Sequence, residues 1–272
     1  MTLTITPVEH ESADFDLDPD VIRALWRMEE HHFWTRSRSE WNAAALAEAG
    51  VEVGARVLDV GCGSGCVAGH LAALGYDVTG VDTAEPLVRK AHERYPAVAF
   101  FVADVDRLPA EAGVFDAVGF FDVLEHMVEP ILMVGAALSR ARPGAVVLAT
   151  VPARRALHSI IDDVSGHKRR YELGELGALF TAAGLIDVRE RGIFRWTEPL
   201  QRLARARYAR TNTYTRFEAR RALIHSLRVP AGPLNGLLRA VCALERRVSL
   251  RRAIDRPGPT LLAVGRVPEA MV

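Results

Sequence analysis

Two acids and three glycines in the first third of the chain have the spacing of a nucleoside site. Asp59 stands two residues before the first of three alternating glycines, Gly61, Gly63 and Gly65. A second acid, Asp82, follows at about the distance, some 20 residues, at which an acidic side chain takes ribose hydroxyls. An acid beside the turn would repel a pyrophosphate but suits an ammonium or sulfonium cation. The pattern therefore favours a nucleoside with a cationic tail over a dinucleotide, whose glycine spacing is G-x-G-x-x-G.

A second group that could do chemistry is the stretch Asp122-Val-Leu-Glu125-His126. It directly follows an apolar run, residues 117–121, that we expect to be a strand. Side chains at the carboxyl end of such a strand face the crevice of a parallel sheet. The three groups would converge if a helix began near Val123. Two carboxylates and an imidazole could hold a divalent cation. His126 could instead act in proton transfer, or it could be structural, and these alternatives stay open.

A third group lies in the loop 165–171, Ser-Gly-His-Lys-Arg-Arg-Tyr. We expect this loop over the mouth of an acceptor pocket. His167 is a second candidate base, while Arg170 and Tyr171 could orient an anionic or carbonyl-bearing acceptor. The alternative is a solvated basic loop, which is the common state of charged loop clusters.

The elements that must position these groups alternate between strands and helices. The first unit is a strand at 56–60, a glycine turn and a helix from Cys66. Further strands are expected at 76–82, 98–102, 117–121, 145–151, 185–194 and 260–267. Helices are expected at 87–95, 131–141 and 172–183, and a helical segment precedes the first strand. The sequence therefore predicts an α/β, doubly wound sheet.

Five segments in this order resemble the motifs of class I S-adenosylmethionine-dependent methyltransferases. They are Val57–Gly65, Val81-Asp82, Phe101–Asp104, Phe115–Val118 and Arg142–Ala145. The resemblance covers roughly residues 30–195. It implies a Rossmann-like seven-stranded sheet with the last strand antiparallel, an N-terminal helical lid, and a helical insertion before the last strand.

The resemblance also implies site residues. The cofactor would be S-adenosylmethionine, and the cofactor-binding residues would be Asp59, Gly61, Cys62, Gly63, Gly65, Asp82, Thr83, Asp104, Val105 and Phe121. The candidate substrate-binding residues are Trp34, Arg36, Asp122, Arg170 and Tyr171, although the aromatic residues before the first strand could equally staple a helix to the sheet. The candidate catalytic residues are His126 and His167.

The segment 122–126 resembles the Glu-x-x-Glu-His of ubiquinone-biosynthesis O-methyltransferases. In those relatives the cluster can hold a divalent cation near the acceptor. The corresponding ligands here would be Asp122, Glu125 and His126. Since Asp122 is shorter than the Glu it replaces, we do not expect a metal.

The predicted organisation has four parts. Residues 1–50 form an acidic segment and a helical lid, 51–194 the cofactor-binding core, 195–258 an Arg-rich helical insertion, and 259–272 the last strand and a tail. The insertion has fifteen Arg against four acidic residues, while the whole chain has a net charge of zero. The insertion could complete the acceptor pocket, form a homodimer arm or lie on an anionic membrane surface. Nucleic acid is the least favoured partner because Lys and base-reading motifs are absent from it.

The sequence thus predicts methyl transfer to a small-molecule acceptor, secondary-metabolite or quinone-like, at an oxygen, nitrogen or carbon atom. A nicotinamide-dependent oxidoreductase and a non-catalytic binding scaffold stay open as alternatives. The three cysteines show no metal spacing, and no apolar run is long enough to cross a bilayer. We expect a cytoplasmic protein.

Overall fold

The computed structural model describes residues 19–206, 221, 223–251 and 256–269. Its centre is a seven-stranded sheet in the order β3-β2-β1-β4-β5-β7-β6. β7 runs antiparallel to both of its neighbours. The strands are β1 (Arg56–Val60), β2 (Asp77–Asp82), β3 (Ala99–Val102), β4 (Phe115–Phe121), β5 (Ala141–Pro152), β6 (Ile186–Ile193) and β7 (Thr260–Arg266). This order confirms the predicted fold class, including the last strand inserted antiparallel between β5 and β6.

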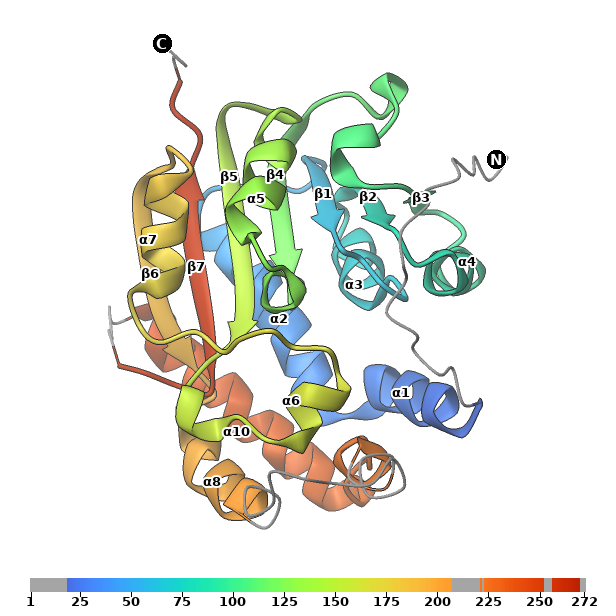
Figure 1. Cartoon of the computed structure of the whole chain (residues 1–272), viewed down its shortest axis with the longest axis vertical. Coiled ribbons are helices and arrows are strands. Elements are labelled where there is room, and N and C mark those ends of the chain that lie inside the picture. The colour runs from blue at the N-terminus through green and yellow to red at the C-terminus, as the bar shows by residue number, and fades with distance from the viewer. Residues whose placement is uncertain (1–18, 207–220, 222, 252–255, 270–272) are drawn as a thin grey trace.

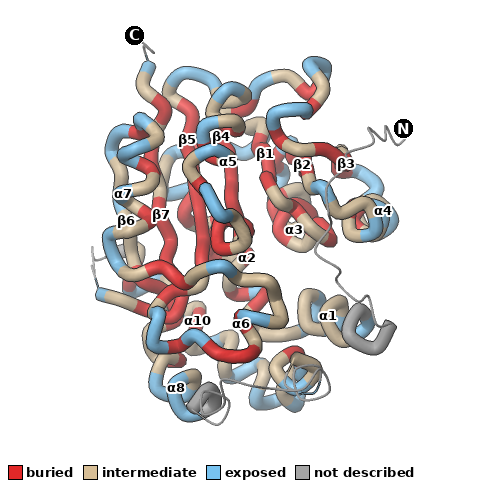
Figure 2. Tube along the Cα trace, in the orientation of Figure 1, coloured by how far each residue is buried: buried red, intermediate tan, exposed pale blue. Residues whose placement is uncertain are grey.

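Helices cover both faces of the sheet, and the strands between them are its most buried part (Figures 1 and 2). One core lies under α5 and α7, and the other under α2, α3 and α4. The described helices are α1 (Pro19–His31), α2 (Phe33–Glu48), α3 (Cys66–Ala73), α4 (Glu85–Arg94), α5 (Pro130–Leu138), α6 (Ile160–Val164), α7 (Glu175–Ala182), α8 (Glu198–Ala206) and α10 (Gly232–Arg251). Buried residues of α2, α3, α4, α5 and α7 pack these five helices against the pleated surface of the sheet.

The strand order reverses between β1 and β4, which pair with each other in parallel. In a doubly wound sheet this reversal opens a crevice outside the carboxyl ends of the strands. α1, α6, α8 and α10 lie beyond that end of the sheet (Figure 1). α10 is fastened to α2 by Arg239 and Arg246, whose guanidinium groups lie 3.0 and 2.6 Å from the carboxylate of Glu40. Helices from both ends of the chain, α1 from the first part and α8 and α10 from the last, therefore cover the crevice.

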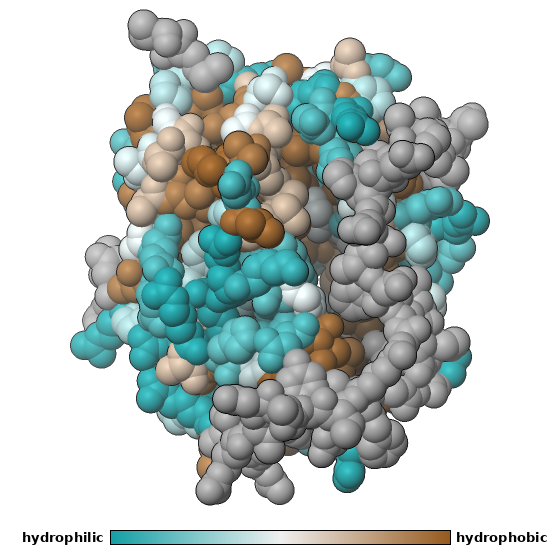
Figure 3. Space-filling model, viewed as in Figure 1, coloured by the Kyte–Doolittle hydropathy of each residue, from teal (hydrophilic) through white to brown (hydrophobic). Residues whose placement is uncertain are grey.

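Exposed apolar side chains are spread over several helices. On the face shown in Figure 3, hydrophobic residues gather over α5, where Leu132 is exposed. Others lie on α8 and α10, including Leu203 and Leu237. Within the described ranges, no helix has the length and apolar character needed to cross a membrane. The acidic N-terminal stretch predicted from the sequence and much of the Arg-rich insertion, with residues 207–220, lie outside the described residues.

Candidate active site

The three glycines after β1 have different neighbours. All three have positive φ angles, between 51° and 76°. A Cβ atom at Gly61 would lie 2.3 Å from a methyl of Val123, and one at Gly65 would lie 2.7 Å from the ring of Phe100. A Cβ atom at Gly63 would meet nothing within 4 Å among the described residues. Gly61 and Gly65 therefore allow close packing, whereas Gly63 exposes main chain to an open hollow that a ligand could fill.

Asp59 lies in β1, two residues before the first of these glycines. Its side chain is 1% exposed, and neither carboxylate oxygen has a hydrogen-bond partner among the described residues. Burial, with a smaller contribution from Asp82, raises the pKa of Asp59 to about 7. The amide of Ala68 opposes this shift without forming a well-aligned hydrogen bond. A buried carboxyl without a partner is costly, and a bound cation would compensate it.

Asp82 joins the glycine turn to the end of β2. Its two oxygens accept the amides of Gly63 and Ala84, each at 2.8 Å. Burial raises the pKa of Asp82, while these amides oppose the shift. Each carboxylate oxygen has a second acceptor position, so the side chain can still receive a hydroxyl group.

α1 closes over the turn through Glu29. The hydroxyl of Ser64 donates to the carboxylate of Glu29, and Arg94 of α4 donates to the same oxygen at 2.7 Å. The ammonium group of Lys90, in α4, also lies 4.6 Å from the centroid of the Trp26 ring, in α1. The first helix is therefore tied to the glycine turn and to α4.

The other predicted cofactor residues lie around the same crevice with different exposures. Val105 and Phe121 are buried in the two cores, and Thr83 is exposed after β2. Burial raises the pKa of Cys62 well above its usual range, so this thiol is protonated. Asp104 precedes the short 3₁₀ turn Val105–Arg107 at the end of β3.

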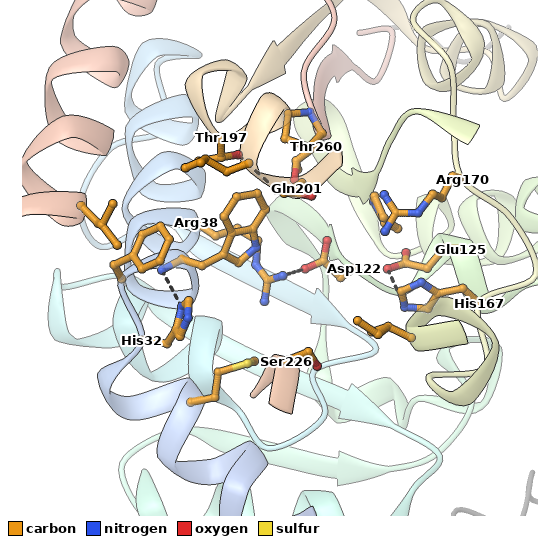
Figure 4. Close-up of a pocket in the computed structure, with 18 of the residues that line it drawn as sticks. His32, Arg38, Asp122, Glu125, His167, Arg170, Thr197, Gln201, Ser226 and Thr260 are labelled. Atoms are coloured by element: carbon orange, nitrogen blue, oxygen red, sulfur yellow. Dashed lines mark hydrogen bonds and ion pairs between the residues drawn. The ribbon is translucent and has the colours of Figure 1, made fainter. Parts of the chain in front are cut away.

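A cavity of about 550 Å³ lies between the sheet and its helical roof. Its walls are mainly apolar and aromatic, with a polar wall at the carboxyl end of β4 (Figure 4). The lining residues come from widely separated stretches of the chain and include Met28, Phe33, Trp34, Ile161, Trp196, Leu200 and Leu238. The predicted insertion thus contributes part of the wall. A cavity of this size and composition is typical of a small-molecule site.

Only one face of α2 is directed at the cavity. Trp34 and Arg38 are four residues apart, lie on the same face, and both line it. Arg36 points elsewhere, is exposed and donates to the backbone oxygen of Glu30 at 3.0 Å. The ring of Trp34 also stacks on Phe194, with centroids 4.1 Å apart. The sequence analysis missed Arg38, although helical spacing from Trp34 would have found it.

The polar wall begins with an ion pair between Arg38 and Asp122 (Figure 4). Asp122 has a φ of 56°, which turns the chain sharply at the end of β4. Beside it, the carboxyl of Glu125 is 1% exposed, and its Oε2 has no partner among the described residues. Burial and then the negative charge of Asp122 raise the pKa of Glu125 well above its usual range. Burial therefore favours the protonated form of this carboxyl, which can donate a hydrogen bond.

The two candidate histidines are neighbours with different surroundings. Their rings pack edge to face with centroids 4.9 Å apart. His167 lines the cavity, with Nε2 4.0 Å from Oε1 of Glu125 and Nδ1 3.0 Å from Oδ1 of Asp162. His126 is absent from the lining, and burial lowers its pKa to about 4. His167 is therefore the better placed of the two to meet an acceptor.

Glu125, His126 and His167 each offer a ligand atom within 4.8 Å of the others. This set differs from the predicted one, because Asp122 is paired with Arg38 and His167 takes its place. A transition metal would accept such donors. Because the pKa of Glu125 is raised, binding of a cation there would have to displace a proton from this carboxyl.

Arg170 and Tyr171 are both buried. Arg170 lies at the edge of the cavity, and its Nε donates to Asp162 at 2.7 Å. The hydroxyl of Tyr171 donates to the backbone oxygen of Leu124 at 3.2 Å, which ties the loop to the end of β4. Both side chains therefore form hydrogen bonds within the protein. Asp162, which accepts the hydrogen bond of Arg170, was not singled out from the sequence.

The sheet order and the glycine turn at its reversal define a Rossmann-like α/β protein with a nucleoside site. A family model described as a methyltransferase domain matches residues 33–228. The chain belongs to this methyltransferase family. The match confirms the resemblance to class I S-adenosylmethionine-dependent methyltransferases.

Two kinds of relatives are similar to this chain. The ubiquinone biosynthesis O-methyltransferase of Xanthomonas axonopodis pv. citri is 42% identical over 112 residues, which are 39% of this chain and 45% of that protein. The chain thus matches less than half the length of this relative. The plantazolicin methyltransferase BpumL in complex with SAH has a TM-score of 0.58 at 15% identity, over 94% of this chain and 91% of that one. A methyltransferase from Archaeoglobus fulgidus has a TM-score of 0.51 at 16% identity, over 84% of this chain and 94% of that one. At these identities the structural likeness concerns the fold.

Proposed function

We propose that this protein transfers the methyl group of S-adenosylmethionine to a small, largely apolar acceptor. The observation that carries the proposal is the buried Asp59 carboxyl, which lacks a hydrogen-bond partner among the described residues and lies beside the open hollow at Gly63. When bound, the ligand supplies a sulfonium whose methyl group is electrophilic. Asp59 would balance the positive charge of the amino acid end, and Asp82 would accept the ribose hydroxyls.

The acceptor would occupy the cavity of about 550 Å³. Phe33, Trp34 and Trp196 give it aromatic walls, so flat apolar bodies are favoured. Since Trp196, Leu200 and Leu238 belong to the segment 195–258, we assign that segment to the acceptor pocket in preference to a dimer arm or a membrane contact. The name of the relatives, ubiquinone biosynthesis O-methyltransferase, makes a hydroxyl oxygen the first acceptor atom to test.

The chain's own contribution is orientation and proton transfer. Holding the acceptor and the methyl donor in one enclosed geometry supplies much of the rate increase for a displacement at a good leaving group. The acceptor must also lose a proton, and His167 is the imidazole that faces the cavity. Glu125, kept protonated by burial, would donate a hydrogen bond to a second oxygen of the acceptor.

Isothermal titration calorimetry with S-adenosylhomocysteine and with NAD⁺ tests the cofactor. We expect binding of the first and none of the second. Mass spectrometry then tests the transfer, with S-adenosylmethionine and two hydroxylated probes, 2-naphthol and 3,4-dihydroxybenzoate. NAD⁺ binding without S-adenosylhomocysteine binding would favour the oxidoreductase alternative, and binding of neither would favour a non-catalytic scaffold.

A further inference from the structure

We propose that Asp162 is a positioning residue that fixes the orientation and tautomer of His167, so that Nε2 faces the acceptor with a free lone pair. The inference rests on the proposed methyl transfer and deepens it, because it states how the base is prepared. Asp162 lies in α6, in the connection between β5 and α7, just before the loop 165–171 that was predicted to cover the acceptor pocket.

Each oxygen of Asp162 has its own task. The side chain is fully buried. Oδ1 lies 3.0 Å from Nδ1 of His167 and accepts Nε of Arg170 at 2.7 Å. Oδ2 accepts the amide of Ser159 at 2.9 Å and so caps α6. Both oxygens are therefore held in place, Oδ2 by the cap of α6 and Oδ1 by Arg170, and Oδ1 is also directed at the imidazole.

The backbone strengthens this arrangement. The amide of His167 donates to the carbonyl oxygen of Asp162 at 2.9 Å, and the amide of Lys168 donates to that of Glu125 at 2.8 Å. Nη1 of Arg170 donates to the carbonyl of Ala153 at 2.8 Å. The ring of His167 is therefore fixed relative to both the cap of α6 and the polar wall of the cavity. Its Nε2 is turned toward Glu125 and the cavity (Figure 4).

The chemistry follows from donors and acceptors. A carboxylate paired with a guanidinium only accepts hydrogen bonds, so the hydrogen of a neutral His167 lies on Nδ1. Nε2 then has a lone pair on the cavity side. A free imidazole in water exchanges its hydrogen between both nitrogens, so this fixed tautomer would be lost without Asp162. Buried carboxylates hold catalytic histidines in the same way in serine hydrolases.

The step balances without a redox partner. Nε2 forms a bond to the proton of the acceptor, and the electron pair released by the acceptor atom forms the new bond to the methyl carbon. The bond between that carbon and the sulfonium breaks, with its pair remaining on sulfur. The imidazolium that results is stabilised by Asp162 through Nδ1 and returns its proton to solvent after product release.

The tautomer can be observed directly and without an acceptor. Long-range ¹H–¹⁵N spectra of the full chain labelled with ¹⁵N-histidine separate protonated from unprotonated ring nitrogens. The signals of His167 are assigned by their loss in His167→Gln. We expect a protonated Nδ1 and an unprotonated Nε2 at pH 8. A hydrogen on Nε2, or averaged signals as in a free imidazole, would overturn the proposal.

Two variants separate positioning from stability. Asp162→Asn should move His167 toward the other tautomer and lower kcat with 2-naphthol by about 100-fold, with KM changed by less than about twofold. Ser159→Ala removes the hydroxyl that lies 3.3 Å from Oδ2 and weakens the same helix cap, but leaves the contact with His167. It should lower the melting temperature while keeping both the tautomer and kcat. Equal kcat in the two variants would assign Asp162 to the cap alone. Absence of S-adenosylhomocysteine binding would refute the proposed function, while the spectra would still decide the role of Asp162.

Discussion

The cofactor hollow and the acceptor cavity are built in different ways. The hollow is made of main chain at Gly63 and of two acids, Asp59 and Asp82, from consecutive strands. The cavity is made of side chains that come from residues as far apart as Met28 and Thr260. The first depends on local sequence, whereas the second depends on how remote segments meet.

This difference separates what each region can tolerate. A site made of main chain binds a constant ligand, and nearly every substitution that adds atoms there disturbs it. A cavity made of side chains from a roof of helices can change its acceptor by changing those side chains, while the sheet stays the same. We therefore expect substitutions in the two regions to affect different ligands, and the following experiments test that separation.

The largest effect is expected for His167→Gln. Glutamine cannot take the proton of the acceptor, so kcat with 2-naphthol should fall by about 10²- to 10⁴-fold. Calorimetry with S-adenosylhomocysteine should give an unchanged affinity, because His167 lines the cavity and not the hollow.

His126→Gln is the matched control. Its ring contacts His167 but does not line the cavity, and burial keeps it neutral with a pKa of about 4. We expect a kcat within a few-fold of the unchanged protein. An equal loss of kcat in both variants would mean that the two histidines act as one unit.

Asp59→Asn should produce the next largest effect, on the other ligand. Loss of a charge-assisted contact should weaken S-adenosylmethionine binding by about 10- to 100-fold at pH 8. In the unchanged protein the pKa of Asp59 is about 7, and a bound cation lowers it. Affinity should therefore fall about tenfold per pH unit below pH 7 and be constant above it, whereas the variant should lack this dependence. Calorimetry from pH 5.5 to 8.5 measures both.

The same substitution weakens cofactor binding but should increase the stability of the ligand-free protein. The folded pKa of Asp59, about 7, lies above the ordinary value of 3.8 for an aspartate. Between these values the folded state holds more protons, so this group lowers stability as pH rises, by at most about 1.4 kcal/mol per pH unit. The difference in melting temperature between Asp59→Asn and the unchanged protein should therefore increase in favour of the variant from pH 4 to 7. Above pH 7 this difference should stay constant. A constant difference would show that Asp59 is already ionised and compensated.

The hollow was largely predictable from sequence, and physical reasons explain why. Its residues belong to one strand–turn–helix unit and to the end of the next strand, so spacing alone brings them together. The sequence could not distinguish the three glycines, because only the positions of Val123 and Phe100 show that Gly61 and Gly65 serve packing.

The cavity was predictable only in part. His167 and Asp122 were expected near an acceptor from their places after strands. The pairing of Asp122 with Arg38, and the contact between Asp162 and His167, depend on the path of a loop and of a helix that no motif describes. Arg38 is the exception, since a residue four positions after Trp34 must share its helical face.

Gly63→Ala tests the open hollow with a smaller change. The added methyl group would meet no atom of the described residues within 4 Å, so it should interfere with the cofactor and not with the fold. We expect about tenfold weaker binding of S-adenosylhomocysteine by calorimetry. Gly184→Ala is the control, since Gly184 also has a positive φ, 86°, and open space around it, in the turn after α7. The Gly184→Ala variant should have a similar cost of backbone strain but an unchanged affinity for S-adenosylhomocysteine.

The smallest effect is expected on the cavity side, at α8. Leu200 and Leu203 lie one turn apart and are 58% and 72% exposed, but only Leu200 lines the cavity. Replacing Leu200 by Gln removes part of an apolar contact, so the KM for 2-naphthol should rise about two- to fivefold without a change in S-adenosylhomocysteine affinity. Leu203→Gln makes the same chemical change outside the cavity and should leave KM unaltered. If both variants raised KM equally, the insertion would act through the general character of its surface. The assignment of the segment 195–258 to the acceptor pocket would then be wrong.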